Sequence, residues 1–143
     1  MALTVLFCGR LLAHRYKVSV YTSDIKNAGT DANMHACLYG KSGDSGDVRL
    51  RTSLTNKDKF ERGRVDEFEL HCIDLGELTK VRIGHDGKGP GSGWHLDKVV
   101  VDAQLLGKTW TFPCGRWFST SEDDRALERI LLPDNQQEVS YQA

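Results

Sequence analysis

The sequence predicts an all-β protein in which two antiparallel sheets pack face to face as a sandwich. Apolar and polar residues alternate with a period of two in at least seven short segments. Gly, Asp, Asn and Ser residues separate these segments, and a long segment with the 3.6-residue period of a helix is hard to find. Because alternation turns one side of each strand inward, two sheets are needed to bury their apolar sides.

The first four strands are expected in the N-terminal half of the chain. The segment YKVSVY (16–21) alternates strictly before a Ser-Asp turn, and MHACLY (34–39) repeats the pattern and ends at Gly40. The segments 48–51 and 68–72 carry the same alternation. Each is short, as strands in sandwiches usually are.

A change of parity marks the strand expected over 94–101. Trp94 and Leu96 share one parity, whereas Val99 and Val101 share the other. This predicts a bulge or bend near Asp97-Lys98, with Trp94 and Leu96 in the core.

Strands are also expected over 81–83 and 110–114, where Trp110 is expected to be buried. The following segment SEDDRALERILLP (121–133) is open to two interpretations. Its acidic start is typical of a helix, but its cluster of Leu and Ile residues would equally form a last strand.

The length of 143 residues suits one domain, and a hydrophobic fraction of 39% can support a core. We expect an irregular apolar leader over 1–14, the folded domain over 15–133 and a polar tail over 134–143. The leader is shorter than the roughly 20 residues of a membrane span, while a signal peptide or presequence stays an alternative. A net charge of −1 gives no overall attraction to nucleic acid, so no nucleic-acid partner is expected.

The four cysteines are spaced too widely for a zinc site built on paired cysteines. Cys37, Cys72 and Cys114 lie in apolar, strand-like segments, where a free thiol behaves as a small hydrophobe. We therefore predict free thiols and a reducing compartment, although two disulfides in a secreted chain are an alternative. A cytoplasmic location follows from this prediction.

Motifs for catalysis are missing from the sequence, which predicts a protein that is not an enzyme. It lacks G-x-S-x-G and H-E-x-x-H, and the glycine-rich segment HDGKGPGSGWHLD (85–97) fits neither phosphate-loop pattern. An apolar helix that could hold a phosphate at its N-terminus does not follow that segment either.

Acidic residues in several expected turns are candidate calcium ligands, because calcium prefers carboxylate and carbonyl oxygens. The candidates are Asp31 with its neighbours Gly29 and Thr30, and Asp58, Glu61 and Asp86. The alternative is that aspartates in turns cap their own backbone.

A basic segment lies between residues 49 and 64, with six basic against two acidic side chains. The basic residues are Arg49, Arg51, Lys57, Lys59, Arg62 and Arg64. They would contact lipid headgroups or an acidic partner, or else form a solvated face. Trp117, near the end of a strand, has an amphipathic ring suited to a membrane interface.

Five segments in order resemble the PLAT domain, also called the lipoxygenase homology or LH2 domain. They are YKVSVYTSD, AGTDANMHACLYG, KFERGRVDEFEL, LTKVRIGHDGKGPGSGWHLDKVVV and TWTFPCGRWF. The resemblance covers about residues 16–133 and is closest to the repeats of lipoxygenase homology domain-containing proteins. It implies an eight-stranded antiparallel β-sandwich similar to C2 domains, and a unit of a tandem-repeat protein or a stand-alone monomer.

The resemblance also implies peripheral binding to membrane lipid or to a membrane-associated protein, in some relatives with calcium. Family calcium positions correspond to the segment 29–31 and to the residues before and within FERG, where Lys59 replaces a carboxylate. Ser92 stands at the last ligand position, with Asp86 as a substitute from the same loop. We therefore expect weak calcium binding at most.

In lipid-binding relatives, exposed aromatic residues precede the GTD segment, whereas this chain offers only Ile25 there. Trp117 matches a membrane-facing position. A protein-interaction or scaffold module without lipid or calcium binding is therefore the alternative function.

Overall fold

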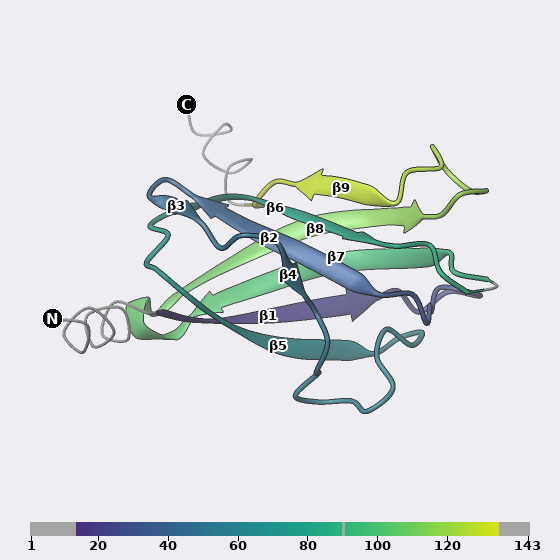
Figure 1. Cartoon of the computed structure of the whole chain (residues 1–143), viewed down its shortest axis with the longest axis horizontal. Helices are drawn as coiled ribbons and strands as arrows, with labels where there is room; N and C mark the ends of the chain where they lie inside the picture. Colours follow the sequence, from purple (N-terminus) through teal and green to yellow (C-terminus); the bar gives the residue numbers. More distant parts are fainter. Residues whose placement is uncertain (1–13, 90, 135–143) are drawn as a thin grey trace, which may run out of the picture.

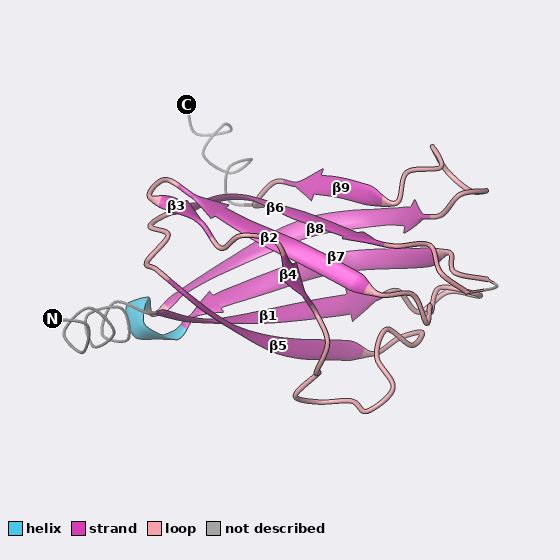
Figure 2. Cartoon of the chain, viewed as in Figure 1, coloured by secondary structure: helices cyan, strands magenta, loops and turns pink. Residues whose placement is uncertain are grey.

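Two antiparallel sheets face each other across an apolar core in the computed structural model, which describes residues 14–89 and 91–134 (Figure 1). Over this part of the chain, strands dominate and the helical content is one 3-10 turn, η1 (Gln104–Leu106) (Figure 2). The prediction of an all-β sandwich is confirmed. The expected leader and tail lie almost entirely outside the described residues.

The first sheet has four strands in the order β5-β1-β7-β8. Their bounds are His14–Thr22 for β1, Val65–Cys72 for β5, Trp94–Ala103 for β7 and Lys108–Phe118 for β8. The predicted irregularity in β7 is present, because Leu96 faces Arg116 while Lys98 faces Pro113. This bulge lets Trp94, Leu96, Val99 and Val101 all reach the core despite their different parity.

The second sheet has five strands, with the order β3-β2-β6-β9 and β4 paired with β2. Their bounds are Met34–Gly40 for β2, Gly43–Asp44 for β3, Val48–Arg49 for β4, Leu78–His85 for β6 and Glu128–Leu131 for β9. The described residues thus contain nine strands rather than the eight expected, and β3 and β4 have only two residues each.

The open question over 121–133 is resolved in favour of a strand. Asp123 and Arg125 have positive φ angles of 55° and 63°, which end any helix before it forms a turn. In β9 itself Leu131 is buried while Ile130 is exposed, which is the two-residue period of a strand at a sheet edge.

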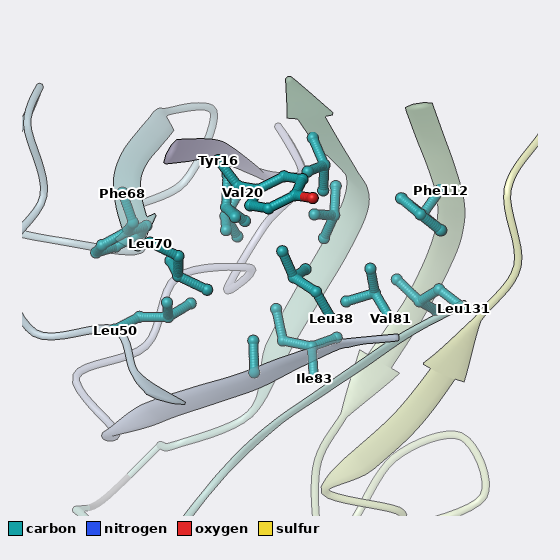
Figure 3. Close-up of a cluster of buried hydrophobic side chains, with 14 of the residues drawn as sticks. Tyr16, Val20, Leu38, Leu50, Phe68, Leu70, Val81, Ile83, Phe112 and Leu131 are labelled. Carbon is teal, nitrogen blue, oxygen red and sulfur yellow. The ribbon is translucent and has the colours of Figure 1, made fainter. Parts of the chain in front are cut away.

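The core lies between the sheets and is built from both (Figure 3). Tyr16, Val20 and Phe68 come from the four-stranded sheet, and Leu38 and Ile83 face them from the other. All five are at most 3% exposed. Fully burying such side chains stabilises the fold by roughly 1.5–3 kcal/mol each. The predicted burial of Trp94 and Trp110 is confirmed.

Hydrogen bonds join the two sides of the sandwich near both ends. Near one end the backbone N–H of Leu75, which precedes β6, donates to the Tyr16 hydroxyl at 3.0 Å. At the other end His85 Nε2, in β6, donates to the carbonyl oxygen of Phe118, in β8, at 2.8 Å. The segments 23–33, 50–64, 86–93 and 119–127 connect strands at this second end, here called the loop end (right in Figure 1).

Candidate functional site

Most of the candidate site residues lie at the loop end, in the segments 23–33 and 50–64. Backbone hydrogen bonds hold these two segments together: the N–H of Gly63 donates to Ser23 O at 3.1 Å, and that of Thr30 donates to Phe60 O at 3.0 Å. The site is therefore built on two connected loops at one end of a rigid sandwich.

A cleft of about 310 Å³ opens between these loops and the start of β2. Buried Met34, Leu50 and Phe60 line its inner part. Its charged lining consists of Arg49, Arg51, Lys57 and Lys59 together with Asp31 and Asp58. We call this cleft, with four cationic and two acidic side chains, the basic cleft.

Arg49 is held in place by a short relay of polar groups. Its Nη2 donates to Asn33 Oδ1 at 2.6 Å, and Asn33 Nδ2 donates to Asp86 Oδ2 at 2.7 Å. Asp86 also accepts the backbone N–H groups of Asn33 and Lys88, both at 3.1 Å. The hydrogen bond from the Asn33 side chain, followed by that from the backbone of Lys88, is the main reason that the pKa of Asp86 falls to about 2. Asp86, a candidate calcium ligand, thus uses its oxygens to orient a cationic side chain.

The loop that carries Lys57 and Lys59 is anchored by a buried carboxylate that the sequence analysis did not single out. Asp66 is fully buried, and its oxygens accept the backbone N–H of Phe60 at 2.8 Å and Asn56 Nδ2 at 3.2 Å. The signal was present in the sequence, because Asp66 shares its parity with the core residues Phe68 and Leu70. A charged residue on the inward side of a strand needs partners there, and the loop supplies them.

The other calcium candidates are divided between two neighbouring clefts. Asp31 and Asp58 line the basic cleft, whereas Gly29 and Glu61 line a second cleft of about 300 Å³, which Asp31 also borders. The Thr30 hydroxyl donates to Ser92 O at 2.7 Å and accepts from Ala32 N at 3.1 Å. Its hydrogen bonds therefore stabilise the turn at Thr30 and join the segments 23–33 and 86–93.

This arrangement does not fit a calcium site. Calcium takes six to eight oxygen ligands, several of them carboxylates. Within residues 14–89 and 91–134, no three Asp, Glu, His or Cys side chains come close enough to hold a metal ion. The cleft that brings Asp31 and Asp58 together also contains four cationic side chains, which would repel the ion.

The candidates for membrane contact lie around the same end. Ile25 is 41% exposed in the 23–33 segment, and Arg64 is also exposed. Arg62 forms an ion pair with Asp24 at 3.0 Å. Trp117 is half-buried on the outer side of β8, with its ring 5.0 Å from that of His95 in an edge-to-face contact. His95 in turn shares a hydrogen bond of 2.7 Å with Ser23, so Trp117 borders the loop end.

Residues 16–132, most of the chain, match the model of the PLAT/LH2 domain family. The chain belongs to this family.

Curated relatives of this PLAT domain are parts of much longer proteins. Lipoxygenase homology domain-containing protein 1 of Mus musculus is 50% identical over 117 residues, which cover 82% of this chain and 6% of that protein. Polycystin-1-like protein 3 of Homo sapiens is 32% identical over 125 residues, or 87% of this chain and 7% of that protein. The chain therefore spans a small fraction of the relatives that it matches.

Solved lipoxygenase structures contain the same fold as this PLAT domain. Coral 8R-lipoxygenase, described as activated by calcium through a C2-like domain, matches with a TM-score of 0.70 at 25% identity. The match covers 83% of this chain and 17% of that one. A calcium-dependent 11R-lipoxygenase matches with a TM-score of 0.61 at 29% identity, over 84% of this chain and 17% of that one. In this PLAT domain, no helix among the described residues is long and apolar enough to cross a bilayer.

Proposed function

We propose that this PLAT domain is a non-catalytic module that attaches to the surface of a membrane through its loop end. The observation that carries the proposal is the basic cleft, which four cationic side chains line, three of them exposed and Lys59 half-buried, at the end that also exposes Ile25. Each basic residue close to an anionic surface contributes about 1 kcal/mol to binding. Ile25 would add an apolar contact, and Trp117 would lie at the border of the contact.

Calcium has at most a small part in this proposed attachment. The two lipoxygenases named above are described as regulated by calcium, and their domains share this fold. The basic cleft differs in charge from a calcium-binding site, since Lys59 lines it together with Asp58. We therefore propose that the cationic side chains take over the electrostatic role that bound calcium would have.

The three described cysteines, Cys37, Cys72 and Cys114, carry free thiols. This supports the proposal that the domain works at the cytoplasmic side of a membrane, where thiols stay reduced. The small share of the curated relatives that the chain covers supports a further proposal, that it is one unit of a tandem-repeat protein.

Co-sedimentation with vesicles tests the membrane function. We expect binding to vesicles of phosphatidylcholine and phosphatidylserine but not to phosphatidylcholine alone, equally in calcium and in chelator, and weaker at high salt. Arg51→Glu should weaken binding severalfold, whereas Lys41→Glu makes the same change of charge at the opposite end and should have less effect. Absence of binding to the anionic vesicles would refute the proposal.

The alternative is a protein-interaction module, and the edge strand β9 favours it. Among the residues that the structure describes, β9 pairs only with β6, and Ile130 is 56% exposed on it. Leu132, which follows β9, is 58% exposed. An unpaired edge with exposed apolar residues is suited to a partner that adds a strand. This function predicts a protein partner whose binding is lost in Ile130→Lys and is unaffected by lipid and by Trp117→Ala.

A further inference from the structure

We infer that the basic cleft is a binding site for one ligand that carries neighbouring phosphate groups, such as the headgroup of a phosphoinositide. This deepens the proposed function, and it rests on that function only for the membrane as the source of the ligand. The cleft would then hold an anion at the place where the family resemblance implies a cation.

The cationic side chains of the cleft are available to a ligand. Among the described residues, none of Arg49, Arg51, Lys57 and Lys59 forms an ion pair with an acidic side chain, although Asp31 and Asp58 line the same cleft. Elsewhere the domain has paired cations, such as Arg116, which contacts Asp123 at 2.5 Å, and scattered exposed ones, such as Lys41 and Arg64, so what sets the cleft apart is that four cations line one concave site. Unpaired cations gathered in one concave site attract multivalent anions more strongly than they do when scattered.

The site is also organised before a ligand arrives. The hydrogen bond from Arg49 to Asn33 uses one N–H of the guanidinium group and leaves the others free for a phosphate, which arginine binds through two parallel hydrogen bonds. On the facing loop, Asp66 fixes Phe60 and Asn56, which flank Lys57 and Lys59. Such preorganisation lowers the entropy lost on binding.

Size and lining favour a headgroup over an acyl chain. The volume of about 310 Å³ lies at the low end of the range for small-molecule sites, about 300–1,000 Å³. Around its mouth, Arg51, Lys57 and Asp58 are exposed and polar. A compact polar ligand would fill this space, and an attached lipid tail would remain outside it.

The two acids distinguish this inference from a calcium site. In an anion site Asp58 repels the ligand, so Asp58→Asn should tighten binding of a phosphate ligand. In a calcium site, or in one where calcium bridges to the headgroup, the same change should weaken binding. The direction of the change therefore decides between the two.

The experiment is isothermal titration of the full chain with soluble inositol trisphosphate, once in the presence of a calcium chelator and once in the presence of calcium. We expect one saturable site, at least a tenfold loss of affinity in Arg49→Gln and in Lys59→Gln, and a severalfold gain in Asp58→Asn. Lys41→Gln, at the opposite end of the sandwich, is the matched control and should bind as the unchanged chain does. Thermal unfolding of each variant checks that it is folded.

Vesicles and inorganic phosphate separate the sources of the ligand. Preference for phosphoinositide over phosphatidylserine vesicles of equal charge supports a headgroup site. Binding of soluble inositol trisphosphate without binding to any vesicle supports the cleft as a site but refutes the membrane function. Equal binding to both vesicle types without a soluble-headgroup site overturns the inference and leaves the membrane function standing. The inference is also overturned if Lys41→Gln loses as much affinity as Lys59→Gln. It is overturned as well if inorganic phosphate binds as tightly as inositol trisphosphate.

Discussion

Asp66 and Asp86 show how the surroundings of a carboxylate decide its role at the loop end. Asp66 is buried and accepts hydrogen bonds from the loop that carries Lys57 and Lys59. Asp86 is exposed and reaches Arg49 through Asn33. Each acid therefore positions cationic side chains on one side of the basic cleft without lining the cleft itself.

Asp66→Ala should destabilise the fold and loosen the loop. The change leaves the buried N–H of Phe60 without an acceptor, which costs about 1–3 kcal/mol. Urea unfolding would measure this loss, with Asp97→Ala as the control at an exposed acid. If the two variants were equally stable, Asp66 would not anchor the loop.

His85 should make the fold less stable in mild acid. Its Nδ1 accepts the N–H of Gly87 and its Nε2 donates to Phe118 O, an arrangement that fits the neutral ring. Burial lowers the pKa of His85 below the ordinary value of 6.5, while the hydrogen bond to Phe118 and the charge of Asp86 oppose this effect. As the pH falls through about 6.5, the unfolded chain takes up a proton that the folded chain resists, so the free energy of unfolding decreases.

Unfolding midpoints in urea between pH 8 and pH 5.5 would check this prediction. His85→Gln should show a flatter dependence on pH, although not a flat one, since burial also lowers the pKa of His95. A pH dependence that His85→Gln leaves unchanged would contradict the prediction.

At the scale of the elements, β2 ends where the chain crosses closely over the segment before β6. A Cβ atom on Gly40 would lie 2.8 Å from the carbonyl carbon of Leu75 and overlap its oxygen. The Leu75 N–H also donates to Tyr16. The glycine therefore allows this segment to close the end of the sandwich opposite the loop end.

Gly40→Ala should destabilise the protein by about 1–3 kcal/mol, because the backbone at Leu75 must move to make room. Thermal and urea unfolding would measure the effect, with Lys41→Ala at the next, exposed position as the control. A stability equal to that of the control would show that this crossing can relax freely.

The sequence predicted the strands well because most of them obey one simple rule. β1, β2 and β5 each alternate between a buried and a more exposed side for most of their length, and the bulge in β7 followed from a change of parity. β3 and β4, of two residues each, are too short for periodicity to reveal. The segment that contains β9 stayed ambiguous between a helix and a strand. The positive φ angles of Asp123 and Arg125 exclude the helix, and the sequence does not reveal these angles.

The whole molecule brings the candidate residues into groups that their spacing in the chain could not predict. Arg49 and Lys59 share a cleft because the 50–64 loop folds back over the start of β2. Asp86 follows β6, so it meets Asn33 just before the paired strand β2 and does not line the cleft with Asp58. Residue type alone predicted which side chains carry charge, but not which of them hold others in place.

Calcium should add little stability to the whole domain. A ligand at 100 times its Kd adds about 2.7 kcal/mol to the free energy of unfolding. We expect millimolar calcium to give far less than this in thermal unfolding compared with chelator, because the basic cleft repels the ion. Lys59→Asp should respond more strongly to calcium than the unchanged chain, and a clear upward shift in the unchanged chain would contradict the prediction.

The direction of the first and last strands has a consequence for longer proteins that contain such a domain. β1 enters at the end opposite the loop end, and β9 runs away from the loop end (Figure 1). The start of β1 and the end of β9 therefore both lie away from the basic cleft. Several such domains in series can reach one surface together, and their individually weak contacts then combine into avidity, in which each bound domain raises the local concentration of the next.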